Sequence, residues 1–275
     1  MKVEVLILVE NTTPVPDFCA EYGFSALISV DNKTFLFDTG SNDALLKNSH
    51  LAGVDLAQVK DLIISHGHFD HTGGVIPFVQ LGKVRRIYAH SNIFTPRYSL
   101  TGDKLRDIGV KFDKLELLAN DIELITTDGY TEIWPSVFVT GEIPRITDYE
   151  DVGGNFLVKC DGKLIADNIP DDMSMVINHP DGLIIISGCA HAGIINTIEY
   201  ARKKSGRSEV LAFIGGTHLM KASEERLAKT VSALRNYNME KIIVSHCTGF
   251  NATVRLFNEF GSKLVKGETS MCFQF

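Results

Sequence analysis

Four side chains that commonly bind metal ions lie within six residues of one another. They are His66, His68, Asp70 and His71, in the segment ISHGHFDHTGG at residues 64–74. Neutral imidazole and carboxylate groups suit zinc, manganese or iron, and the residue types alone do not choose among these metals. Because the whole chain has only nine histidines, their concentration in this loop predicts a metal site.

Three more histidines stand in a similar sequence context. His191, His218 and His246 each follow an apolar run and have small residues beside them. Such runs predict buried strands, and loops at strand ends are where functional groups gather. Taken singly, each histidine is equally consistent with a structural hydrogen bond. Together they favour a shared site, in which we expect His218 to donate a hydrogen bond to the substrate or to developing negative charge.

The elements that must position these groups are predicted from the apolar pattern. Strands are expected at 3–9, 24–30, 34–40 and 61–65, and strands alternate with helices after residue 175. This order is typical of sheets covered by helices. Two stretches, near 91–120 and 140–172, have weak periodicity, and we expect them to be irregular substrate-binding loops.

Composition excludes some classes of function. The net charge of the 275-residue chain is −7, which argues against a nucleic-acid-binding protein. No apolar run approaches the roughly 20 residues that a membrane span requires. The five scattered cysteines lack the CxxC spacing and indicate reduced thiols in a cytoplasmic protein. The oligomeric state is not predicted.

Three of these segments resemble signatures of the metallo-β-lactamase superfamily. HGHFDH fits its HxHxDH motif, FLFDTG resembles its earlier aspartate motif at Asp38, and VSHCTG resembles its C-terminal histidine motif at His246. The resemblance implies an α/β fold over residues 1–275 as a single domain: a four-layer αβ/βα sandwich of two mixed β-sheets with helices on the outer faces. It also implies two metal ions, zinc or else manganese or iron. His66 and His68 would bind the first ion, and Asp70, His71 and His246 the second.

The chain departs from the superfamily pattern at two ligand positions. Asn168 falls near the place of a third histidine, and Cys189 falls near the place of an aspartate that bridges the metals. We expect His191 to supply the missing histidine, with a carboxylate from Asp171 or Asp172 or a thiolate from Cys189. Asp38 is expected to orient a ligand histidine, or else to cap a turn.

The resemblance implies a metal-dependent hydrolase that uses an activated water on an ester, lactone or phosphoester, with Asp70 beside that water. The segments SGCAHAGIINTI and GGTHL resemble one branch of the superfamily, whose members are similar to dihydropterin-ribofuranosylaminobenzene 5′-phosphate synthase. That branch implies an alternative, a transferase that condenses a pterin diphosphate with a phosphorylated aryl riboside. A further alternative is a non-catalytic metal- or ligand-binding protein. For a phosphorylated or pterin-like small molecule, the basic and aromatic side chains of the two loop stretches are binding candidates: Arg97, Tyr98, Lys104, Arg106 and Arg145.

Overall fold

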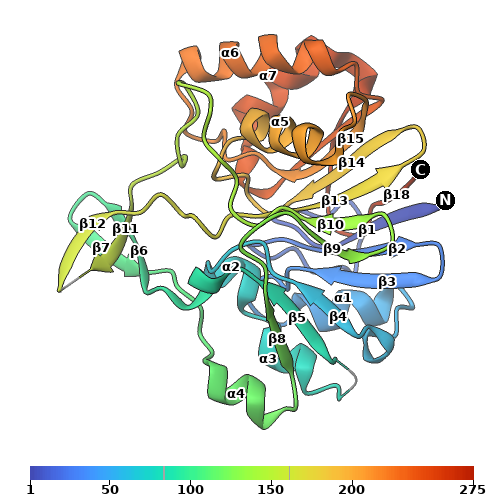
Figure 1. Ribbon diagram of the computed structural model, residues 1–275, viewed down its shortest axis with the longest axis vertical. Helices are drawn as coiled ribbons and strands as arrows, with labels where there is room; N and C mark the ends of the chain where they lie inside the picture. Colours follow the sequence, from blue (N-terminus) through green and yellow to red (C-terminus); the bar gives the residue numbers. More distant parts are fainter. Residues whose placement is uncertain (83, 161) are drawn as a thin grey trace.

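Two mixed β-sheets pack face to face in the computed structural model, which describes residues 1–82, 84–160 and 162–275 (Figure 1). The first sheet has the order β18-β1-β2-β3-β4-β5-β8 and the second β17-β16-β15-β14-β13-β10-β9. The first sheet consists of β1 (Val3–Val9), β2 (Ser25–Val30), β3 (Lys33–Phe37), β4 (Asp61–Ile63), β5 (Arg86–Ala89), β8 (Glu123–Thr126) and β18 (Cys272–Gln274). The second consists of β9 (Thr131–Trp134), β10 (Val137–Val139), β13 (Ser174–His179), β14 (Gly182–Ser187), β15 (Val210–Gly216), β16 (Lys241–Ser245) and β17 (Leu264–Lys266).

Helices cover the outer face of each sheet, so the predicted four-layer sandwich is confirmed (Figure 1). On the first sheet lie α1 (Ala44–Leu51), α2 (Phe69–Thr72), α3 (Val75–Val79) and α4 (Lys114–Ala119); on the second lie α5 (Ile194–Ser205), α6 (Glu224–Leu234) and α7 (Phe250–Phe260). Short 3₁₀ turns are η1 (Leu56–Gln58), η2 (Ser91–Phe94), η3 (Arg235–Tyr237), η4 (His246–Thr248) and η5 (Gly261–Lys263). No helix in the described ranges is both long and apolar enough to cross a bilayer.

The central strands are continuous apolar runs because both of their faces are buried. In β14, Ile184 and Ile186 join the core between the sheets, whereas Ile185 faces the core beneath the helices. In β3, Phe37 faces the core between the sheets, and Leu36 faces the core beneath the helices of the first sheet. A strand covered on both faces has no polar side to expose, which explains why these runs lack alternation.

A third, four-stranded sheet projects from the sandwich, at the left of Figure 1. We call it the small sheet; its order is β12 (Lys163–Ala166), β11 (Phe156–Cys160), β6 (Arg97–Thr101) and β7 (Lys104–Asp107). The expectation that 91–120 and 140–172 are irregular is therefore wrong for these strands and for α4. Strands β7 and β12 are exposed throughout, so they carry little of the apolar alternation that identifies a strand.

The topology brings the ends of strands from both sheets to one edge. Strands β3, β4 and β5 run parallel in the first sheet, as do β14, β15, β16 and β17 in the second. The carboxyl ends of parallel strands point the same way, and ligand sites form there in α/β proteins. The loops after β4, β14, β15 and β16 carry the predicted histidines.

Candidate metal centre

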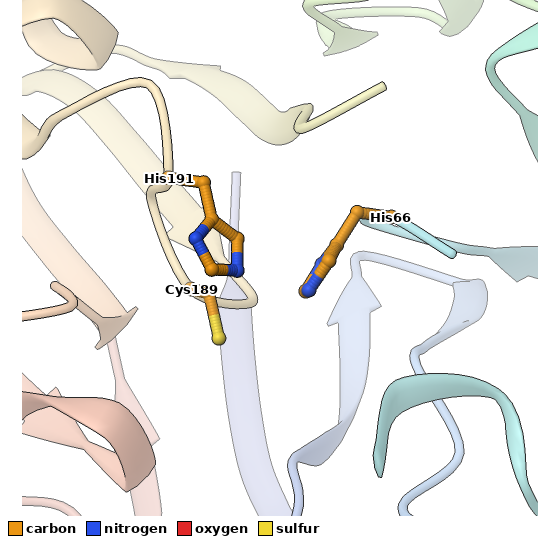
Figure 2. A group of neighbouring side chains, drawn as sticks. All are labelled: His66, Cys189 and His191. Atoms are coloured by element: carbon orange, nitrogen blue, oxygen red, sulfur yellow. The ribbon is translucent and has the colours of Figure 1, made fainter. Parts of the chain in front are cut away.

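The histidines predicted from separate strand ends do converge. His66 follows β4 of the first sheet, and Cys189 and His191 follow β14 of the second. Figure 2 shows the rings of His66 and His191 next to each other in an edge-to-face arrangement, with the thiol of Cys189 beside that of His191. The ring centroids of His66 and His191 are 4.8 Å apart, and all three residues are buried.

Hydrogen bonds fix the proton on one nitrogen of four of these rings. Carbonyl and amide oxygens accept from Nδ1 of His191 (Val152 O, 2.8 Å) and of His246 (Asn11 Oδ1, 2.9 Å). The Asp38 carboxylate accepts from Nδ1 of His71 at 2.7 Å. A ring whose Nδ1 donates a proton presents an unprotonated Nε2 when neutral, which is the form that binds a metal.

The fourth ring, that of His66, is held by the same carboxylate through a serine. Ser65 Oγ donates to Asp38 Oδ2 at 2.7 Å, so it accepts from His66 Nδ1 at 2.9 Å. The lone pair of His66 Nε2 then points toward His68 Nδ1, 3.0 Å away. Asp38 therefore contacts two ligand candidates, His71 directly and His66 through Ser65, and it does so from a left-handed backbone (φ 56°).

Buried ring nitrogens without a partner indicate that a cation belongs here. Among the described residues, His68 Nε2 and His191 Nε2 have no hydrogen-bond partner. Such orphaned polar atoms are costly in a protein interior. Burial also lowers the pKa values of His66, His68 and His191 well below the ordinary value, so these rings are neutral. The residues present thus fit the metal ion that this part of the fold would hold.

A second set of groups lies directly beside the first. Nε2 of His246 is 3.2 Å from Oδ2 of Asp70, and Nε2 of His71 is 3.2 Å from Sγ of Cys189. Burial opposes the ionisation of Asp70, but the neighbouring imidazoles of His246, His71 and His68 bring its pKa below the usual range. Burial disfavours protonation of His71, but the charge and hydrogen bond of Asp38 raise its pKa to about 9.

Cys189 is common to both sets. Its Sγ lies within 4.8 Å of ligand nitrogens of His66 and His191, and equally of those of His71 and His246. Burial raises the pKa of its thiol, and a bound divalent cation would reverse that effect by stabilising the thiolate. A third trio of donors, Cys189, His218 and Cys247, contains the same sulfur. A sulfur within reach of several imidazoles on two sides is the arrangement expected of a ligand that could be shared by adjacent ions.

Comparison with known proteins agrees with this geometry. A family model described as the metallo-beta-lactamase superfamily matches residues 20–158. A synthase of Methanocaldococcus jannaschii, 7,8-dihydropterin-6-methyl-4-(beta-D-ribofuranosyl)-aminobenzene-5′-phosphate synthase, is 33% identical over 261 residues, covering 88% of this chain and 86% of that protein. The chain belongs to the metallo-beta-lactamase superfamily. Membership of this superfamily implies divalent metal binding.

Solved structures of the superfamily share the fold. A metal-dependent hydrolase of the beta-lactamase superfamily has a TM-score of 0.82 and 29% identity, over 98% of both chains. The Zn²⁺-bound PqqB of Methylobacterium extorquens has a TM-score of 0.59 and 12% identity, over 98% of this chain and 99% of that one. The second likeness shows the fold alone.

Asp171 and Asp172, predicted as possible metal ligands, accept hydrogen bonds from the backbone of the loops that carry the histidines. Asp171 Oδ2 accepts from the backbone N–H of Gly67 at 2.8 Å, and Asp172 Oδ2 accepts from that of Ala192 at 2.8 Å. Neither aspartate is in a trio of metal-capable donors in the described ranges. Their carboxylates thus fix the backbone next to His66, His68 and His191, which is a positioning role within this superfamily site.

Two of the three arginines predicted to bind substrate, Arg97 and Arg145, already pair with groups of the protein. Arg97 is buried and pairs with Asp167 and Asp171. Arg145 donates to the carbonyl oxygens of His191 (2.7 Å) and Asn168 (2.6 Å). Neither arginine lines the cavity over the metal-binding groups, and Tyr98 does not line it either. The structure therefore places the two arginines among the groups that hold the loops of the site, and Tyr98 outside the cavity lining.

The cavity over the metal-binding groups has a volume of about 220 Å³. His68, Asp70, Cys189, His191 and His246 form its floor; the rest of its lining includes Tyr22, Phe69, Ser99, Thr101, Arg106, Phe156, His218 and Lys221. The strands β6, β7 and β11 of the small sheet thus supply one wall. Residues from both segments that were expected to be substrate-binding loops line the cavity, and several of them belong to paired strands of the small sheet.

Cys247 is a site residue that the sequence reasoning missed. Its Sγ accepts from the backbone N–H of His218 at 3.3 Å and contacts the carbonyl oxygen of Cys189 at 3.6 Å. It therefore ties together the loops after β14, β15 and β16. His218 adopts a left-handed backbone (φ 47°) at this point and faces the cavity. The position of Cys247, directly after His246 at a strand end, was the available signal.

The buried carboxyl group of Asp172 gives a pH-dependent prediction. Burial raises its pKa to about 7, above its ordinary value, so ionisation destabilises the folded state as pH rises from about 4 to 7. Asp172→Asn keeps the oxygen that accepts from Ala192 and removes this cost. In metal-free protein we expect the variant to be more stable than the wild type by about 2–4 kcal/mol at pH 8 and equal to it near pH 4. Urea unfolding at both pH values measures the difference. The exposed Asp103→Asn is the control; a gain that is the same at pH 4 and pH 8 would contradict the explanation.

Proposed function

We propose that the protein is a metal-dependent hydrolase that cleaves an ester, lactone or phosphoester bond of a small molecule. The observation that carries this proposal is the convergence of His66, His191, His71 and His246 on the shared thiol of Cys189. A thiolate among imidazoles favours zinc over manganese, so we propose two zinc ions. Ions in such a site lower the pKa of water and polarise the bond under attack.

The residues around the cavity have distinct parts in this reaction. Asp70 stays ionised because its pKa is below the usual range, and it lines the cavity. A carboxylate that is so weakly basic suits hydrogen bonding to the attacking water better than taking its proton. His218 lies on another wall, and its Nδ1 has no partner among the described residues. It is placed to donate a hydrogen bond to the oxygen on which negative charge develops.

Replacement of a ligand tests the proposal directly. His68→Ala is expected to lose at least half of the bound metal and the metal-stimulated hydrolysis, and to leave the fold intact. The reason is that the His68 ring lies 4.4 Å from that of His66 and 5.0 Å from that of His191, and its buried Nε2 has no partner among the described residues. The measurements are metal content by mass spectrometry, circular dichroism, and hydrolysis of an ester, lactone and phosphoester panel before and after chelation. His50→Ala, on the exposed end of α1, is the matched control. Full metal content in His68→Ala would refute the assignment.

A second function is favoured by one observation, the 33% identity to the pterin-related synthase over most of both chains. In this alternative the protein is a transferase that joins a pterin diphosphate to a phosphorylated aryl riboside. The same metal-loaded protein is incubated with either substrate alone and with both together. Product that forms only from the pair would support the transferase and exclude the hydrolase.

A further inference from the structure

Two cationic side chains stand at the cavity from different parts of the chain. Arg106 belongs to β7 of the small sheet, and Lys221 lies in the segment between β15 and α6. Both line the cavity, and both are exposed to solvent. Within residues 1–82, 84–160 and 162–275, neither makes an ion pair with a carboxylate. This distinguishes them from Arg97, whose charge is balanced by two aspartates.

Arg106 is held over the site by an aromatic ring. Its guanidinium carbon lies 4.7 Å from the ring centroid of Phe69, the residue directly after His68. Cation–π contact of this kind positions a guanidinium without neutralising its charge.

The charge of the cavity contrasts with that of the whole molecule. The chain carries a net charge of −7, yet the cavity lining contains one carboxylate, Asp70, against the two cations Arg106 and Lys221. Two unpaired cations facing such a lining create a local positive potential that attracts anions. Solubility alone does not explain why both cations line the same cavity.

We propose that Arg106 and Lys221 form an oxyanion-binding subsite, which holds a phosphate or carboxylate group of the substrate at the cavity wall, apart from the metal-binding groups. The hydroxyls of Ser99 and Thr101, on the neighbouring strand β6, line the same wall and complete the set of donors. Phe156 of β11 offers an apolar ring beside it for the uncharged part of the molecule. This inference rests on the proposed function, because it assumes that a small-molecule substrate occupies the cavity.

The subsite also explains the presence of the small sheet. Arg106, Ser99, Thr101 and Phe156 all come from its strands, and its pairing of β6 with β11 joins two segments that are about sixty residues apart in the sequence. A paired sheet fixes the spacing of these side chains more firmly than a loop does. The small sheet is therefore the element that selects substrates by their anionic group.

The subsite is tested by binding, so that the result does not depend on turnover. Phenylphosphonate and benzoate are titrated calorimetrically into metal-loaded wild type and into Arg106→Gln, Lys221→Gln and Lys104→Gln. Lys104 is an exposed cation on the same strand that does not line the cavity. We expect each of the first two variants to raise the Kd about tenfold, as loss of a charge-assisted hydrogen bond does, and Lys104→Gln to leave it unchanged. The probe that binds more tightly identifies the anionic group as phosphoryl or carboxylate.

Unchanged affinity in both cavity variants, or no binding of either probe to the wild type, would overturn the subsite. Metal content is measured in the same samples and is expected to stay at the wild-type level, since neither residue is a metal ligand. Failure of the subsite with metal and hydrolysis intact would leave the proposed function standing. Loss of the proposed function would appear instead as metal-free protein or absent turnover.

Discussion

Cys189→Ser is expected to release most of the bound metal and to reduce activity by at least about 100-fold. The sulfur of Cys189 lies within 4.8 Å of the ligand nitrogens of His66 and His191 and of those of His71 and His246, so its loss would remove a donor from both of the proposed metal positions. A serine hydroxyl is neutral near pH 7 and is a far weaker ligand than a thiolate. By contrast, replacing His68, which we expect to bind one ion only, should reduce the occupancy of mainly that ion.

Metal content by mass spectrometry and hydrolysis with added zinc measure this effect. Cys272→Ser, which changes an exposed cysteine of β18, serves as the control and should resemble the wild type. Cys189→Asp should retain more metal than Cys189→Ser, because a carboxylate can also bridge two ions. If Cys189→Ser binds as much zinc as the wild type, the sulfur is not a ligand and the shared-ligand arrangement is wrong.

The parts of the site that could be predicted are those encoded locally. His66, His68, Asp70 and His71 lie within one loop, so their spacing alone indicates the chemistry. His191 and His246 follow apolar runs, and the rule that strand ends converge brings them to the loop. The apolar runs and the alternation of strands and helices predict sheets covered by helices, whereas the four-layer sandwich was implied by the resemblance to the metallo-β-lactamase superfamily.

The parts that could not be predicted depend on contacts between distant segments. The role of Arg97 is set by Asp167 and Asp171, which are 70 and 74 residues away, and no local pattern announces such a pairing. The small sheet escaped prediction because β6 pairs with β11 across a comparable separation and its strands are largely exposed. The sequence alone does not distinguish a buried structural arginine such as Arg97 from an exposed one such as Arg106; their burial in the folded structure does.

Arg97→Met is expected to destabilise the protein by about 3–5 kcal/mol, because it leaves buried carboxylates without their counter-charge. The side chain is 1% exposed, and its Nε is 2.8 Å from Asp167 Oδ2. Its two terminal nitrogens reach the two oxygens of Asp171 at 2.8 and 2.7 Å. Methionine fills much of the same volume but brings no charge, so the loss is electrostatic and not a cavity effect.

The pH dependence of this variant separates charge from packing. Burial raises the pKa of Asp171, and Arg97 opposes that rise, so the pKa should climb further without the arginine. An acid whose pKa is raised by folding costs stability above its unfolded pKa and regains it as pH falls. The deficit of Arg97→Met should therefore shrink between pH 8 and pH 5, as measured by thermal unfolding, and Asp171→Asn should rescue part of it at pH 8. The exposed Arg85→Met should change stability little at either pH. If Arg97→Met loses the same stability at both pH values, Arg97 acts by packing. If the loss is smaller at pH 5, the charge of Arg97 holds Asp171 in place. Asp171 in turn fixes the backbone of Gly67, which lies between His66 and His68.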